Sequence, residues 1–134
     1  MFSIMLVDDQ PAILAGLTSL VEGTGIAKVV ATETDADVAI STALDKRPDI
    51  ILLDVSLGGD SGVDVAHKLF QQWPDARVLA VSAHADSVYV RGMLNAGASG
   101  YMLKDNGPGE IVDAIKTIMD GGQWIGEDLA FNPT

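Results

Sequence analysis

The chain has 134 residues, with 8 Lys and Arg against 19 Asp and Glu, so its formal net charge is −11. This length suits one compact domain, and a hydrophobic content of 48% argues against intrinsic disorder. The absence of cysteine excludes disulfides, thiolate chemistry and zinc–thiolate sites. Strong acidity argues against a nucleic-acid partner, and we find neither a membrane-spanning run nor a signal-peptide pattern. We therefore expect a cytoplasmic domain that binds neither nucleic acid nor membrane.

Apolar strand-like runs alternate with segments of helical periodicity along most of the chain. Strands are predicted at 2–7, 28–32, 49–54, 76–82 and 98–103, and a helix is predicted after each of them. The third run, Ile50–Leu53, is apolar on both faces, which is typical of a central parallel strand. The pattern predicts an α/β fold: a flavodoxin-like, doubly wound, five-stranded parallel sheet of order 2-1-3-4-5 with five helices. The domain is expected to span residues 1–122, and residues 123–134 are interpreted as a linker.

Three carboxylates follow two neighbouring strands of this predicted sheet. Asp8 and Asp9 close the first strand, and Asp54 closes the third. In a doubly wound sheet, ligands bind outside the carboxyl ends of the strands, where the strand order reverses. Like charges gathered there repel one another unless a cation joins them, and hard oxygen ligands favour Mg²⁺. The alternative is that each Asp simply caps the next helix.

Two further polar residues close the last two predicted strands at the same edge. Ser82 ends the fourth strand, and Lys104 follows the fifth. An ammonium group and a hydroxyl are both suited to phosphoryl oxygens, although each residue alone is more often an ordinary surface or turn residue.

Together, these residues and the strand–helix pattern resemble the receiver domain of two-component response regulators. The resemblance covers residues 2–122 and rests on four segments and their order: Leu6–Pro11, Leu52–Val55, Ser82-Ala83 and Gly97–Lys104. The segment Leu94–Asp105 and the ending Gly121–Trp124 are similar to the branch whose members carry a LuxR-type helix-turn-helix output domain. Such a DNA-binding domain would follow Thr134 in a longer parent chain and would control transcription.

The resemblance implies that Asp54 accepts a phosphoryl group from a sensor histidine kinase. Mg²⁺, or Mn²⁺ as a substitute, would be held by Asp9, Asp54 and the Ser56 main-chain carbonyl, with Asp8 acting through water. Such a domain is a signalling switch rather than an enzyme, because it catalyses only its own phosphoryl transfer and slow dephosphorylation.

The same resemblance assigns the switch to three residues. Lys104 would neutralise phosphoryl charge, and Ser82 would turn inward to hydrogen-bond the phosphoryl group. Tyr101 would then move from an outward to an inward rotamer. Homodimerisation on phosphorylation is a further expectation.

The sequence departs from the family pattern at two positions. Gln10 stands where this branch commonly has His, and Gly58 replaces the usual Pro after the acceptor. With Gly59, Gly58 predicts weaker ordering of residues 56–61 in the absence of metal or phosphate. Ser56 and His84, each two residues beyond a site residue, are candidates for tuning the phosphoryl lifetime, or else are ordinary loop residues.

Three other functions fit the pattern less well. A haloacid-dehalogenase-type phosphatase has its nucleophile after the first strand in an Asp-x-Asp pattern, which is absent here, and the length leaves no room for a cap domain. A nucleotide- or flavin-binding module needs a phosphate loop where this chain has Gln10–Ile13. A scaffold that no longer accepts phosphate usually lacks the acceptor, the acidic pair or the lysine, and all of these are present.

Overall fold

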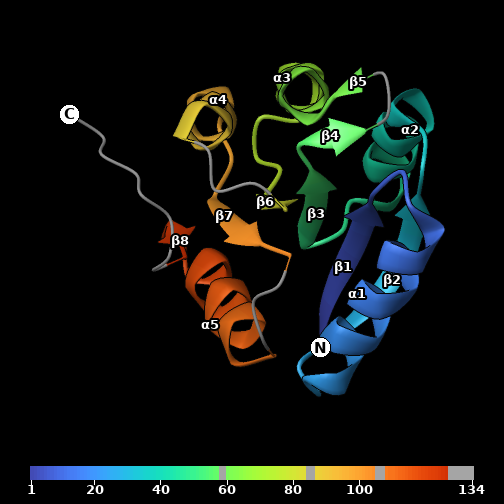
Figure 1. Cartoon of the computed structure of the whole chain (residues 1–134), viewed down its shortest axis with the longest axis vertical. Coiled ribbons are helices and arrows are strands. Elements are labelled where there is room, and N and C mark those ends of the chain that lie inside the picture. The colour runs from blue at the N-terminus through green and yellow to red at the C-terminus, as the bar shows by residue number, and fades with distance from the viewer. Residues whose placement is uncertain (58–59, 84–86, 105–107, 127–134) are drawn as a thin grey trace.

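The computed structural model describes residues 1–57, 60–83, 87–104 and 108–126. The strands are β1 (Phe2–Val7), β2 (Ala27–Glu33), β3 (Ile50–Asp54), β4 (Ser56–Leu57), β5 (Asp60–Ser61), β6 (Val78–Ser82), β7 (Gly100–Leu103) and β8 (Trp124–Ile125). The helices are α1 (Pro11–Gly23), α2 (Ala36–Lys46), α3 (Gly62–Gln72), α4 (Ser87–Ala96) and α5 (Pro108–Met119). Figure 1 shows the strands crossing the centre of the molecule, with helices on both sides.

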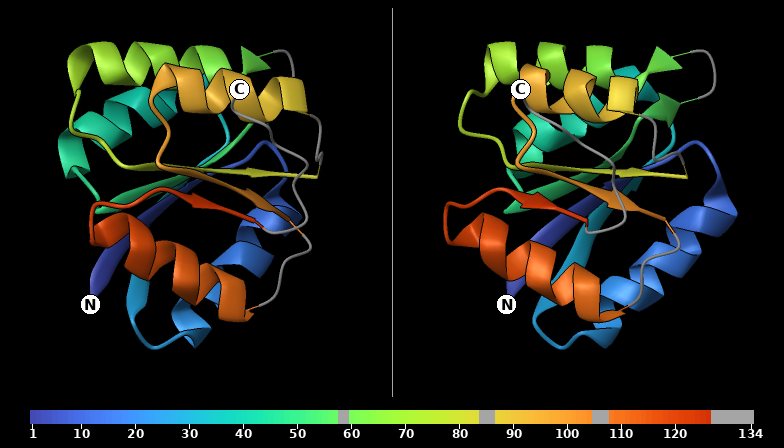
Figure 2. Two further views of the ribbon diagram at one scale, coloured as in Figure 1. Left: turned by 90° about the vertical axis from the view of Figure 1, so that its left-hand side faces the viewer. Right: turned by 60° about the vertical axis from the view of Figure 1, so that its left-hand side comes forward.

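The main sheet has the strand order β2-β1-β3-β6-β7-β8, and every neighbouring pair is parallel. Figure 2 shows the sheet edge-on, with α2, α3 and α4 over one face and α1 and α5 over the other. The order of the first five strands confirms the predicted doubly wound fold, with β1 and β3 at the reversal point.

The sheet also contains a short sixth strand that the periodicity did not predict. Trp124–Ile125 pairs with Gly100-Tyr101, so the segment interpreted as linker begins with sheet structure. Two residues are too few to give a periodic signal. A second unpredicted feature is the antiparallel pair β4–β5, which joins Ser56 to Ser61 and Leu57 to Asp60. Residues 58 and 59, on which the ordering prediction for 56–61 centres, lie outside the described residues.

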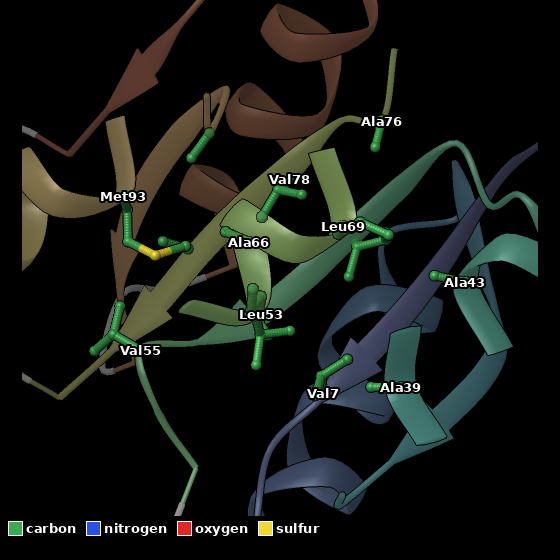
Figure 3. Packing of buried hydrophobic residues seen from close by; sticks show 14 of the residues in the cluster. Val7, Ala39, Ala43, Leu53, Val55, Ala66, Leu69, Ala76, Val78 and Met93 are labelled. Atoms are coloured by element: carbon green, nitrogen blue, oxygen red, sulfur yellow. The ribbon is translucent and has the colours of Figure 1, made fainter. Parts of the chain in front are cut away.

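Each face of the sheet has its own apolar core. Figure 3 shows the core beneath α2, α3 and α4, where side chains such as Leu53, Leu69 and Met93 interdigitate. The opposite core packs α1 and α5 against residues that include Leu6, Leu52 and Ile115. Since β3 is buried along its whole length between these cores, its apolar run is explained by burial on both faces.

Local chemistry accounts for several helix ends. Pro11 occupies the first turn of α1, where its missing N–H is not needed. Helix α2 ends at Lys46, and its C-cap residue Arg47, which has φ +47°, is followed by Pro48, so the helix ends near Arg47 as the proline predicted. In the part of the chain that the structure describes, no helix is both long and apolar enough to cross a bilayer.

Candidate functional site

The sheet register brings the polar residues of four strands to one edge. Val7 pairs with Leu53, Asp54 with Val81, and Ser82 with Leu103. The residues that follow or end these strands, Asp8, Asp54, Ser82 and Lys104, therefore lie at the same carboxyl edge. This is the location that a doubly wound sheet uses for ligands.

Lys104 bridges two buried carboxylates. Its Nζ lies 2.8 Å from Oδ2 of Asp8 and 3.1 Å from Oδ2 of Asp54. Asp8 is 1% exposed and Asp54 5%, whereas Asp9 is exposed at the rim. One ammonium group faces two buried carboxylates and can neutralise only one of them, so the site retains a net negative charge that can attract a cation.

The two backbone amides that hold these carboxylates each come from the residue two positions after the aspartate. The Gln10 N–H donates to Oδ1 of Asp8 at 2.9 Å, and the Ser56 N–H donates to Oδ1 of Asp54 at 3.1 Å. Each carboxylate therefore has one oxygen fixed by the main chain and the other facing Lys104. This arrangement orients both groups before any ligand binds.

The aspartates do not cap the following helices. Gln10 is the N-cap residue of α1 and makes no side-chain capping hydrogen bond, while α3 begins only at Gly62 and is capped by Ser61. The capping interpretation therefore fails for Asp8 and Asp54, and their gathering at one edge needs another explanation.

Burial and neighbouring charges shift the pKa of both Asp54 and Lys104. Burial is the main cause that raises the pKa of Asp54, and the charge of Asp8 adds to it; hydrogen bonds from Ser56 and Lys104 lower this pKa only partly. For Lys104, burial lowers the pKa, but the hydrogen bonds and charges of Asp8 and Asp54 outweigh it and raise the pKa above its ordinary value. Lys104 is therefore firmly cationic, whereas ionised Asp54 is less stable here than in water.

The three carboxylates fit a hard divalent cation. One oxygen from each of Asp8, Asp9 and Asp54 lies within 4.8 Å of the other two. Oδ2 of Asp8 is buried, and Lys104 is its ion-pair partner. An all-oxygen donor set with one exposed member suits Mg²⁺, which keeps several water ligands.

A cavity of about 380 Å³ opens beside these groups. Its wall contains Asp9, Asp54, Ser56 and Lys104, together with three residues to which the sequence assigned no site role: Gln10, Ile13 and Ala83. Gln10 and Ala83 lie in the segments that carry the resemblance and follow Asp9 and Ser82 directly, whereas Ile13 lies outside those segments. The cavity gives a small anionic group access to the Asp54 carboxylate.

The two residues of the predicted switch, Ser82 and Tyr101, are both buried. Ser82 is fully buried at the end of β6, next to Ala83 in the cavity wall. Tyr101 is also fully buried and packs in the core beneath α2, α3 and α4, which corresponds to the inward position named above. Its predicted movement stays a prediction. His84 lies outside the described residues.

Comparison with known proteins decides the family. The family model described as "Response regulator receiver domain" matches residues 4–116. The chain belongs to the response regulator receiver family. Its members of known sequence include the transcriptional regulatory protein DegU of Brevibacillus brevis, 32% identical over 96% of this chain and 55% of that protein. A nitrate/nitrite response regulator protein homolog of Haemophilus influenzae is 36% identical over 94% of this chain and 61% of that protein.

Solved receiver structures agree with this assignment. A LuxR-family two-component response regulator from Aurantimonas sp. SI85-9A1 superposes with a TM-score of 0.92 at 35% identity, covering 97% of this chain and 93% of that one. The receiver domain of the NarL regulator of Mycobacterium tuberculosis gives 0.82 at 30% identity, covering 90% and 97%. The relatives thus confirm the resemblance to LuxR-family response regulators. The receiver chain spans 55–61% of the length of the curated relatives that it matches.

Proposed function

We propose that this receiver domain accepts a phosphoryl group on Asp54 from the phosphohistidine of a sensor histidine kinase, in a Mg²⁺-dependent reaction. The observation that carries the proposal is the contact of Lys104 with both Asp8 and Asp54 beside an open cavity. An acceptor carboxylate, a cation-binding pair and an ammonium group meet there, which are the groups that phosphoryl transfer requires of a protein.

In the proposed transfer, a carboxylate oxygen of Asp54 forms a P–O bond while the P–N bond to the kinase histidine breaks. The electron pair of the P–N bond returns to the imidazole, and the product is an acyl phosphate. The Ser56 N–H and Lys104 orient Asp54, and Lys104 also lies close enough to stabilise charge on the phosphoryl oxygens.

We infer that Asp9, Asp54 and the Ser56 carbonyl would hold Mg²⁺ directly and Asp8 through water. When bound, the ion neutralises charge on the carboxylates and on the transferring group. Mn²⁺ has the same preference for oxygen ligands and would substitute.

The consequence of phosphorylation is also a proposal. We propose a switch rather than an enzyme: the domain turns over only its own phosphoryl group, and Ser82 and Tyr101 change position when the group is present. The transcriptional regulatory protein DegU named above supports an output in transcription, which we propose is carried by a DNA-binding domain outside this chain. We further propose that phosphorylation favours a homodimer.

The test is incubation of the chain with Mg²⁺ and acetyl phosphate, followed by intact-mass measurement. We expect a gain of one phosphoryl group, lost in Asp54→Asn and in the presence of a chelator. Asp64→Asn, which changes an exposed aspartate on α3, is the matched control and should be phosphorylated normally. No gain in the wild-type protein with any phosphodonor would overturn the proposal and favour a scaffold.

A further inference from the structure

Strand β8 follows α5 and lies at the free edge of the main sheet. Figures 1 and 2 show it beside β7, with α4 over one face of the sheet and α5 over the other. The turn between α5 and β8 depends on Gly121, whose φ is +89°, a conformation that residues with a Cβ rarely adopt. This turn returns the chain toward the sheet, so that β8 runs parallel to β7.

The main chain of β7 carries the docked strand. Trp124 N–H donates to the Ser99 carbonyl at 3.0 Å, and Gly126 N–H donates to the Tyr101 carbonyl at 3.2 Å. The side chains of β8 divide between the two cores: Trp124 packs on the core beneath α1 and α5, and Ile125 packs on the opposite core. β8 therefore closes both apolar layers at this edge.

Gly100 makes the close approach of the two strands possible. A Cβ at this position would lie 2.3 Å from the Trp124 carbonyl oxygen and 3.1 Å from Leu79. The first contact is with backbone and cannot be relieved by a side-chain rotation. Any side chain at position 100 should therefore push β8 away from β7.

β7 connects this docked strand directly to the site at the other end. Tyr101, whose carbonyl accepts from Gly126, is three residues before Lys104, and Lys104 N–H donates to the Ser82 carbonyl at 2.8 Å. In the described part of the sheet, β7 lies between β6 and β8. Undocking β8 would leave the Tyr101 carbonyl without this partner and would loosen the strand that positions Lys104.

We propose that β8 is a strap coupled to the Asp54 site. Docked β8 holds β7 and Lys104 in the arrangement that accepts a phosphoryl group, and occupancy of the site in turn tightens the docking, since coupling between two sites is reciprocal. This inference rests on the proposed function of Asp54.

The first measurement is amide hydrogen exchange, which reports docking without any phosphate. We expect the Gly126 amide to be protected in the wild-type protein and to exchange at least about tenfold faster in Gly100→Ala. Trp124→Pro removes one docking hydrogen bond and the packing of the Trp124 side chain, and it adds no contact near Leu79, so it keeps the test valid if Gly100→Ala does not fold. Gly109→Ala, whose added Cβ would meet nothing within 4 Å, is the control. An unprotected Gly126 amide in the wild-type protein would overturn the strap.

The second measurement is binding of beryllofluoride with Mg²⁺, a mimic of the phosphoryl group. We expect it to slow Gly126 exchange in the wild-type protein and to bind about fivefold more weakly to Trp124→Pro and Gly100→Ala than to Gly109→Ala. Equal binding by all the variants would overturn the coupling, even if the strap is docked. If the wild-type protein itself binds no beryllofluoride, both the proposed function and the coupling fail, and exchange alone then decides whether β8 is docked.

Discussion

At the scale of single residues, the site is governed by an imbalance of charge. One ammonium group, on Lys104, faces two buried carboxylates, those of Asp8 and Asp54. Because Lys104 lowers the pKa of Asp54 while burial and Asp8 raise it, each of the three groups depends on the other two. The excess of negative charge at the site favours the binding of a divalent cation.

Removing the ammonium group should damage both stability and transfer. We expect Lys104→Met to lower the free energy of unfolding at neutral pH by roughly 2 kcal/mol, because two buried carboxylates then face each other unpaired. Phosphorylation by acetyl phosphate should slow by about 100-fold, the loss typical of one electrostatic donor. Denaturant unfolding and intact-mass time courses measure these effects. Lys68→Met, on the exposed side of α3, should change neither, and similar effects in both variants would contradict the role of Lys104.

Neutralising Asp54 should have the opposite effect on the stability of the metal-free protein. Since the pKa of Asp54 is raised on folding, ionisation of Asp54 lowers stability as the pH rises from the ordinary carboxyl pKa through the raised one. We therefore expect Asp54→Asn to stabilise the protein at neutral pH by on the order of 1 kcal/mol, and to have no such effect below the ordinary carboxyl pKa. Unfolding curves at several pH values, in chelator, measure this.

Magnesium provides the control for that experiment. Mg²⁺ should raise the stability of the wild-type protein, because a ligand that binds only the folded state stabilises it. The rise should be absent or much smaller in Asp54→Asn. An Asp54→Asn variant that is less stable than the wild-type protein at neutral pH in chelator would contradict the charge imbalance.

At the scale of elements, the junction between β3 and α3 fixes the position of Asp54. Gly62 N–H donates to the Val55 carbonyl, and a Cβ on Gly62 would lie 2.1 Å from the Asp54 carbonyl oxygen and 2.6 Å from the Cα of Val55. The start of α3 therefore rests directly on the backbone that presents Asp54. The sequence did not predict this contact of Gly62. The residue lies eight positions after Asp54, and only the folded chain brings the two together.

Adding a methyl group at this junction should be costly. We expect Gly62→Ala to lower the free energy of unfolding by roughly 2 kcal/mol or more, since backbone must move to relieve the contact. Mg²⁺ affinity should fall as well, because Asp54 and Ser56 shift with the backbone. Gly16→Ala in α1, where the added Cβ would meet nothing within 4 Å, should not destabilise the protein. Equal stability and Mg²⁺ affinity of the two variants would contradict the positioning role of Gly62.

The elements also show what periodicity can predict and what it cannot. The five strand–helix units and the end of α2 before Pro48 followed from apolar spacing and backbone chemistry. The strands β4, β5 and β8 each have two residues, so they carry no periodic signal, and their pairing is decided by tertiary contacts. The bound of the domain at residue 122 stays a prediction, although the sheet continues to Ile125.

At the scale of the whole molecule, topology converts scattered residues into one site. Asp8, Asp54 and Lys104 are far apart in the sequence, but parallel strands in this order bring them to one edge, which is why the sequence could predict them together. The hydrogen bonds from the Gln10 N–H to Asp8 and from the Ser56 N–H to Asp54 could not be predicted. They depend on the local backbone conformation and not on residue type.

Phosphorylation should also change the oligomeric state if the proposed dimer forms. Sedimentation velocity of the wild-type protein with beryllofluoride and Mg²⁺ should show a shift from monomer toward dimer. Asp54→Asn under the same conditions is the control and should not shift. A wild-type protein that binds beryllofluoride and stays monomeric would contradict the dimer while leaving the phosphoryl site intact.

The most direct test of the central claim is to locate the phosphoryl group on the chain. After treatment with acetyl phosphate and Mg²⁺, reduction with borohydride converts an aspartyl phosphate to homoserine, which peptide mass spectrometry can locate. The proposed function predicts homoserine at position 54 and none in chelator-treated protein. Homoserine at another aspartate, or none in the Mg²⁺-treated protein, would contradict the assignment of Asp54 as the phosphoryl acceptor.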